Sequence, residues 1–247
     1  MSNLGTWVGG LARKWLERFR QSHGLQEMAQ PNADCPNGTQ TKSYERRILL
    51  HVGCGGASIA DIIVPGFRVA EQGWQEVRLD ADERVKPDIV GSMTDMRAVS
   101  DASADAIFSS HGIEHLYWHD VPVALGEFFR VLADEGFAVI TCPDLQAAAE
   151  MIAEDRVFET AYESPAGAIT PFDMVYSYRP FVAANPEWMS HHCGFTLTTL
   201  SECLRRAGFP SVFGFRRKNG FDLWVLASKS PRNAEALKLL AAEYLPA

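Results

Sequence analysis

The sequence predicts an α/β fold with a doubly wound, mostly parallel sheet that ends in an antiparallel hairpin. The apolar run Ile48–Val52 leads into a glycine-rich turn, and the shorter run Val77–Asp80 ends in a carboxylate. Asn219 and Gly220 lie between two further apolar runs, which is typical of a hairpin turn. A strand, a glycine turn and a helix start, in this order, predict a site for a nucleotide cofactor.

The other elements are predicted from apolar periodicity and from glycine and proline positions. Strands are expected at Ile48–Val52, Val77–Asp80, Asp88–Gly91, Ala104–Ser110, Phe137–Cys142, Ser211–Arg217 and Phe221–Ser228. Helices are expected at Leu4–Arg20, Ile59–Val64, Leu145–Val157, Thr196–Ala207 and Asn233–Tyr244, with one more ending at Leu132. The segment Phe158–His192 is aromatic and shows little periodicity, so we expect either a substrate-selecting lid or an aromatic flap that extends the core.

These elements predict one large domain with additions at both ends, as the length of 247 residues also suggests. We assign 1–43 to an amphipathic helix and linker, 44–230 to the main domain with the lid at about 158–192, and 231–247 to a C-terminal helix. The first helix is expected to cover the domain or to contact a membrane surface or partner protein through 4–20.

Composition excludes several classes of function. The net charge of −8 and the pI of about 5.4 argue against a nucleic-acid partner. Five cysteines without a C-x-x-C pair fit a reducing cytoplasm, so we expect a cytoplasmic protein. The sequence shows no secretory signal and no apolar run near the roughly 20 residues that span a bilayer.

The glycine turn V-G-C-G-G distinguishes between cofactors. A dinucleotide site has a third glycine for close packing around the pyrophosphate, but Ser58 stands at that position. The short form resembles the first motif of class I S-adenosylmethionine-dependent methyltransferases. That family commonly has an acidic residue two positions before the first glycine, where this chain has His51.

A second stretch strengthens the resemblance. Ser103–Leu132 resembles the family pattern S-F-D-x-I-x-S-S-H-x-x-E-H followed by a helix ending in R-V-L, and the likeness resumes at His191–Phe209. The chain is therefore similar to class I methyltransferases of the methyltransferase-11 type, some of which are associated with cell-surface polysaccharide and glycolipid pathways. The resemblance implies a seven-stranded Rossmann-like sheet and S-adenosylmethionine as the cofactor, which is released as S-adenosylhomocysteine.

The resemblance also implies which residues bind the cofactor. Asp80 is placed to accept hydrogen bonds from the ribose hydroxyls, and Asp95 to meet the adenine amino group, unless it is only an exposed loop acid. Met96 is the expected apolar neighbour of the adenine ring. The expected cofactor-binding set is His51, Gly53, Gly55, Asp80, Asp95, Met96 and Ser110.

Two histidines are candidates for catalysis. His111 follows the fourth strand and His191 ends the lid, so both are expected on the acceptor side of the cofactor. A hydroxyl acceptor benefits from a base near its proton, and histidine suits this near neutral pH. We therefore expect methyl transfer to a hydroxyl of a small-molecule or carbohydrate-linked acceptor, although either histidine could instead have a structural hydrogen bond.

Three alternatives stay open from the sequence. His111, Glu114 and His115 form H-x-x-E-H, the inverted zinc-peptidase motif, although Gly112 disfavours the helix that this motif needs. An NAD-dependent oxidoreductase is the second alternative. The third is a protein that binds S-adenosylmethionine without catalysis and acts as a partner in a larger assembly.

Overall fold

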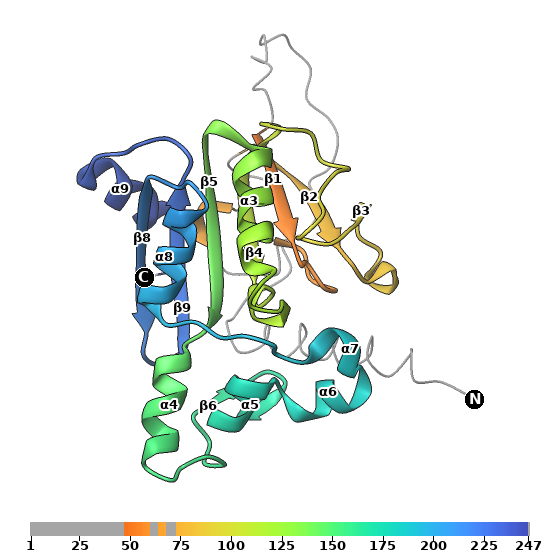
Figure 1. Cartoon of the computed structure of the whole chain (residues 1–247), viewed down its shortest axis with the longest axis vertical. Helices are drawn as coiled ribbons and strands as arrows, with labels where there is room; N and C mark the ends of the chain where they lie inside the picture. Colours follow the sequence, from red (N-terminus) through yellow and green to blue (C-terminus); the bar gives the residue numbers. More distant parts are fainter. Residues whose placement is uncertain (1–46, 60–63, 68–72, 247) are drawn as a thin grey trace, which may run out of the picture.

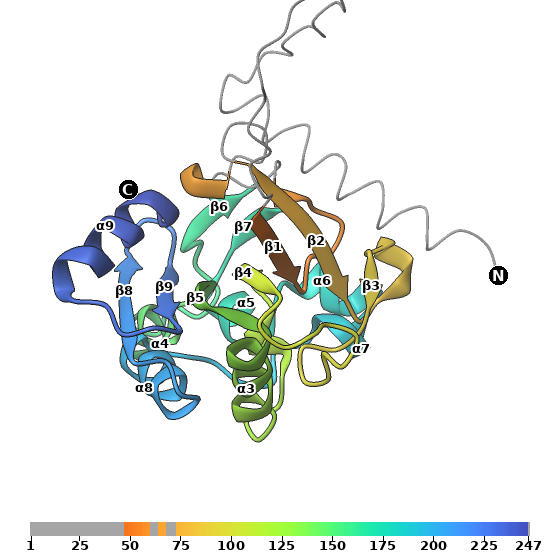
Figure 2. The ribbon, with the colours of Figure 1, turned by 90° about the horizontal axis from the view of Figure 1, so that it is seen from above.

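The structure is a computed structural model that describes residues 47–59, 64–67 and 73–246. Its centre is a seven-stranded sheet in the order β3-β2-β1-β4-β5-β9-β8, as Figures 1 and 2 show. The strands are β1 Arg47–Val52, β2 Trp74–Asp80, β3 Ile89–Val90, β4 Ala104–Ser110, β5 Leu132–Pro143, β8 Ser211–Arg217 and β9 Asp222–Ser228. The predicted seven-stranded sheet is therefore confirmed.

Strand direction gives the sheet one functional edge. β1 pairs in parallel with β2 and β4, β2 with β3, and β4 with β5, whereas β9 is antiparallel to both β5 and β8. The carboxyl ends of β1 to β5 consequently meet at the same edge, the lower one in Figure 1. Ligands of open α/β sheets bind in the crevice at this edge, where the strand order reverses.

Helices cover both faces of the sheet, as Figure 2 shows from above. The α-helices are α3 Val121–Val131, α4 Leu145–Ala153, α5 Pro171–Tyr176, α6 Arg179–Ala184, α7 Pro186–Met189, α8 Leu197–Arg206 and α9 Ala234–Tyr244. The described residues also form three 3₁₀ helices, at Pro65–Phe67, Glu83–Val85 and Ile113–His115. Apolar side chains of α3 and α8 belong to one core cluster, and those of α9 belong to a second one. Within the described ranges, no helix is both long and apolar enough to span a bilayer.

The segment between β5 and α8 extends beyond the carboxyl edge of the sheet (Figure 1). Its two ends lie side by side, because Asp144 and Phe195 form a parallel bridge and the Leu145 N–H donates to the Phe195 carbonyl at 2.9 Å. We call residues 145–194 the inserted segment. It holds α4 to α7 and a small hairpin of β6 Tyr162–Ser164 and β7 Gly167–Ile169.

The inserted segment is more regular than its weak periodicity predicted. Its short helices start at proline-containing turns, and Thr170 and Asp173 form a reciprocal capping box at α5. The helix predicted at Leu145–Val157 ends earlier, because Asp155 has a φ of +60°. The predicted helix Leu4–Arg20, the linker and residues 60–63 of the helix expected after the glycine turn lie outside the described residues.

Arg130 explains the arginine of the R-V-L motif. From the end of α3 it donates to the Met96 carbonyl at 2.9 Å and the Val99 carbonyl at 3.0 Å, and it pairs with Glu127 at 2.7 Å. It also pairs with Asp101 at 2.5 Å. One guanidinium thereby fixes the loop that precedes β4.

Replacing Arg130 with methionine is expected to lower the free energy of unfolding by about 2 kcal/mol, since hydrogen bonds to charged groups are lost and carbonyls lose their donor. Urea unfolding followed by circular dichroism measures this. Arg97→Met is the matched control, because that side chain is 85% exposed in a surface ion pair, and its unfolding midpoint should not change. An unchanged midpoint for Arg130→Met would contradict the anchoring role.

Candidate functional site

The glycine turn borders open space at the carboxyl end of β1. Gly53 and Gly55 have φ values of +67° and +53°, a region where side chains with a Cβ are strained. A Cβ built on Gly55 meets no atom within 4 Å. The backbone at Gly55 is therefore open to a ligand, as the sequence predicted for a cofactor turn.

Asp80 lies beside this turn at the end of β2. Its Oδ2 accepts from the Gly55 N–H at 2.7 Å, and its Oδ1 accepts from the Asp82 N–H at 2.9 Å. Each carboxylate oxygen keeps a further lone pair, so ribose hydroxyls can still donate to it. The open Gly55 and the half-buried Asp80 together fit the adenosyl end of S-adenosylmethionine.

Arg78 of β2 contacts the glycine turn, and the sequence analysis did not predict this contact. Its guanidinium donates to the Gly55 carbonyl at 2.7 Å and to the Ala57 carbonyl at 3.2 Å. These bonds hold the turn from the β2 side. The only signal in the sequence for this contact is that an arginine stands two residues before the aspartate that ends β2.

His51 was expected to contact the cofactor, but its side chain is buried, with 1% exposed. Its Nδ1 lies 2.8 Å from Glu76 Oε1, which also accepts from the Ile59 N–H at 2.9 Å. The imidazole thus links β1 to β2 under the turn. The structure gives this side chain no open face toward the adenosyl position.

Asp95 and Met96 do not come together as an adenine site. The Asp95 carboxylate is 48% exposed and pairs with Arg97, whereas Met96 is 1% exposed within the core. The tight turn closed by the Ser92–Asp95 bridge directs residue 96 inward. Met93 lies beside the turn instead, with its Cε 3.4 Å from a Cβ built on Gly53.

The predicted site residues Ser110 and His111 lie at the carboxyl end of β4. Ser110 is half-buried at the end of β4, opposite Thr141 of β5. His111 follows with a φ of +51° and a side chain that is 46% exposed. Gly112 follows in a tight place, because a Cβ there would lie 3.2 Å from Met93 Cε and 3.3 Å from Ser109 Oγ.

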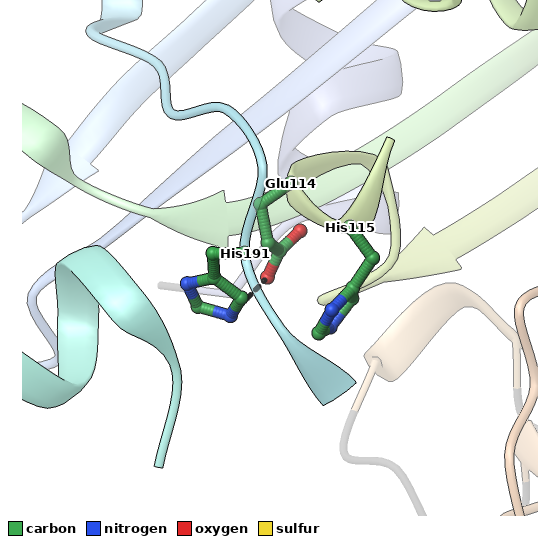
Figure 3. Close-up of side chains that lie close together, drawn as sticks. All are labelled: Glu114, His115 and His191. Carbon is green, nitrogen blue, oxygen red and sulfur yellow. Dashed lines mark ion pairs between the residues drawn. The ribbon is translucent and has the colours of Figure 1, made fainter. Parts of the chain in front are cut away.

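Glu114 and His115 follow in the same segment, and they lie close to His191, so that the three residues form one cluster, as Figure 3 shows. Glu114 and His115 belong to the 3₁₀ helix Ile113–His115, and His191 comes from the inserted segment. His111 Nδ1 lies 3.3 Å and His191 Nε2 lies 4.0 Å from Glu114 Oε1. The two predicted catalytic histidines therefore flank one carboxylate.

The environment changes the acidity of these groups. Desolvation by burial lowers the pKa of His111. The hydrogen bond to Glu114 and its negative charge have the larger combined effect, so the pKa of His111 is raised above its usual value. Burial alone would raise the pKa of Glu114, yet the surrounding histidines hold it below its usual value. Burial lowers the pKa of His191 to about 4, so this imidazole is neutral at neutral pH.

A cavity of about 260 Å³ opens beside the cluster. Its lining includes Glu114 and His191 together with Leu145, Met174 and Tyr176 of the inserted segment. Most of the exposed lining is apolar, and Glu114 and His191 are among the residues that contribute polar groups. Such a lining suits a small molecule that is oriented by a few polar contacts.

The H-x-x-E-H motif does not form a zinc-peptidase helix. Its glutamate and second histidine lie in a single 3₁₀ turn, and His111 precedes that turn in the left-handed region. The described residues that can share a metal ion are Glu114, His115 and His191, without His111. The zinc-hydrolase hypothesis through His111, Glu114 and His115 is therefore wrong in its ligand set.

Comparisons with known proteins address the fold and the family. Residues 50–140 match a family described as a methyltransferase domain. A crystal structure of a possible exported protein from Bordetella parapertussis is 15% identical, with a TM-score of 0.50, and covers 89% of this chain and 68% of its own. No curated protein sequence matches the chain.

Two further solved structures are similar. The CMeT domain of the citrinin polyketide synthase is 13% identical, with a TM-score of 0.50, over 76% of this chain and 48% of its own. A crystal structure named as a putative S-adenosylmethionine-dependent methyltransferase from Listeria monocytogenes is 15% identical, with a TM-score of 0.49, and covers 75% of this chain and 92% of its own. At these identities, the likenesses to the Bordetella protein and to the citrinin synthase domain establish the fold alone.

The family match favours methyl transfer over the oxidoreductase alternative. The match begins in β1 at residue 50 and ends in β5. It includes the glycine turn, Asp80 and the 3₁₀ helix Ile113–His115. The matched residues thus carry the cofactor half of the candidate site. Residues 50–140 therefore belong to a methyltransferase domain, and its cofactor is S-adenosylmethionine.

Proposed function

We propose that the protein methylates a hydroxyl oxygen of a small-molecule or carbohydrate-linked acceptor bound in the cavity beside Glu114 and His191. The observation that carries the proposal is this cavity, because it lies next to the histidine cluster that follows β4 at the cofactor edge. S-adenosylmethionine, when bound, supplies a methyl group already activated by a positively charged sulfur. The protein must then position the acceptor oxygen and exclude water.

The inserted segment performs the exclusion and shapes the acceptor site. It lies beyond the carboxyl ends of the strands, and its Met174 and Tyr176 help to line the cavity. The His192 N–H donates to the Glu114 carbonyl at 2.9 Å, which fixes the end of the segment to the loop after β4. Acceptor selectivity therefore belongs to this segment, and cofactor binding to the sheet.

The histidines provide the polar contacts. His191 Nδ1 lies 3.1 Å from the Met174 carbonyl, so Nδ1 carries the proton and Nε2 keeps a lone pair for an acceptor hydroxyl. His111 is exposed and adjoins Glu114, so it can pass a proton from the site to water. We assign His191 to orienting the hydroxyl, and neutral His111 to receiving the hydroxyl proton through Glu114, which adjoins both the cavity and His111.

Replacing His111 or His191 with alanine is expected to slow turnover by at least about tenfold, while the affinity for S-adenosylmethionine stays within a few-fold of wild type. Release of S-adenosylhomocysteine with a panel of hydroxylated acceptors measures turnover, and calorimetry measures affinity. His119→Ala is the control, because this side chain is 79% exposed and pairs with Asp120 and not with Glu114. Unchanged turnover in both variants would remove the assignment. Binding of S-adenosylmethionine without any methyl release would favour the non-catalytic alternative.

A further inference from the structure

We propose that Glu114, His115 and His191 bind one divalent transition-metal ion, with Zn²⁺ as the reference ion. One oxygen and two imidazole nitrogens from these residues all lie within 4.8 Å of one another. The inference rests on the proposed function, because it places the ion at the wall of the same acceptor cavity. It changes the role of His191 from a direct contact with the acceptor to a ligand that acts through the ion.

The separations are close to those of a metal centre. Glu114 Oε1 and His191 Nε2 are 4.0 Å apart, and the two imidazole centroids are 4.8 Å apart. A tetrahedral Zn²⁺ with bonds of about 2.1 Å holds its ligand atoms about 3.4 Å from one another. Small side-chain rotations therefore suffice to close the three groups around an ion. Figure 3 shows all three side chains converging on one space.

Both imidazoles are already in the tautomer that binds a metal through Nε2. His115 Nδ1 lies 3.1 Å from the Ser190 carbonyl, and His191 Nδ1 lies 3.1 Å from the Met174 carbonyl. A carbonyl only accepts hydrogen bonds, so each Nδ1 carries the proton and each Nε2 presents a lone pair. Metal-binding histidines are commonly fixed in this way by a second group on the other nitrogen.

Glu114 supplies an independent observation that favours a bound cation. Its side chain is 1% exposed, and neither carboxylate oxygen accepts a regular hydrogen bond from any described residue. A buried carboxylate without such partners is costly, and the lone pair of His191 Nε2 faces it as a second acceptor. A cation between the two removes this conflict. His111 lies 3.3 Å away and compensates the charge only from the exposed side.

The backbone holds the ligands before any ion binds. The His192 and Cys193 N–H groups both donate to the Glu114 carbonyl, at 2.9 and 3.2 Å, so the two ligand-bearing segments are joined directly. Two histidines and one glutamate leave coordination positions free, as in catalytic zinc sites. Because Glu114 and His191 line the cavity, an acceptor hydroxyl can take a free position, where the ion lowers its pKa and the proton leaves to water.

Metal titration of the full chain tests the site without any acceptor. After treatment with EDTA and removal of the chelator, CoCl₂ is added and followed by visible absorption, and ZnCl₂ is added and followed by calorimetry. We expect one ion per chain in wild type and at least about a 100-fold loss of affinity in His115→Ala and Glu114→Gln. His119→Ala should bind like wild type. Absence of stoichiometric binding in wild type, or affinity unchanged in both ligand variants, overturns the site.

Two further measurements separate this proposal from the proposed function. Circular dichroism and binding of S-adenosylmethionine should be unchanged in Glu114→Gln, which excludes unfolding as the cause of lost metal binding. If protein treated with EDTA transfers methyl groups at the rate of untreated protein, the metal has no role in the acceptor site, but the proposed function is unaffected. Stoichiometric metal binding together with no transfer to any hydroxylated acceptor supports the site and contradicts the proposed function.

Discussion

Replacing Gly55 with valine is expected to lower the affinity for S-adenosylmethionine by at least about 100-fold. Gly55 has a φ of +53°, which is strained for a β-branched residue, and its Cβ position points into the open space of the predicted adenosyl site. Its N–H also donates to Asp80 at 2.7 Å, so a shifted turn would move the carboxylate that is expected to bind the ribose. Calorimetric titration with S-adenosylmethionine and with S-adenosylhomocysteine measures the loss.

Gly56→Val is the matched control for this substitution. A Cβ on Gly56 also meets no atom within 4 Å, but its φ is not positive. We expect its affinity to stay within a few-fold of wild type. An equal loss in both variants would show that any added bulk at the turn interferes, and wild-type affinity in Gly55→Val would place the cofactor elsewhere.

Replacing Gly66 with alanine is expected to lower the free energy of unfolding by about 3 kcal/mol. A Cβ on Gly66 would collide with the ring of Tyr244 and lie 2.6 Å from the Glu243 carbonyl oxygen. Tyr244 is 1% exposed, and its ring centroid lies 4.8 Å from that of Phe67 and 4.6 Å from that of Phe137. The ring has no room to retreat, so α9 must shift away from the sheet.

Urea unfolding of Gly66→Ala measures this cost, and Gly126→Ala makes the same chemical change in open space. Gly126 lies within α3, and a Cβ there meets nothing within 4 Å. Alanine should stabilise that helix by about 0.5–1 kcal/mol. If both variants unfolded at the same urea concentration, the packing of α9 over Gly66 would be contradicted.

The sheet could be predicted because its signals are local. Short apolar runs predict β4 and β8, and Ala104–Ser110 and Ser211–Arg217 have the predicted bounds. The turn at Asn219-Gly220 places the hairpin, and Gly208 follows the end of α8. Each of these features depends on a few neighbouring residues, so one sequence is enough to predict it.

The site could be predicted only in part, because its contacts join distant residues. Asp80 and the glycine turn follow from the ends of adjacent strands, and the structure brings them together. Glu114 and His191 are 77 positions apart, and only the path of the inserted segment brings them to 4.0 Å. Met96 and Met93 differ by three positions, and one tight turn decides which of them lies beside Gly53.

The bridge between Asp144 and Phe195 has a consequence for how new specificities arise. Both ends of the inserted segment leave the sheet at one point, so its 50 residues form a closed loop that puts no strain on strand register. Lengthening or exchanging such a loop costs little chain entropy. Segments of different size can therefore be joined at this point without changing the strands of the sheet, and with them the proposed acceptor site can change while the proposed cofactor site stays the same.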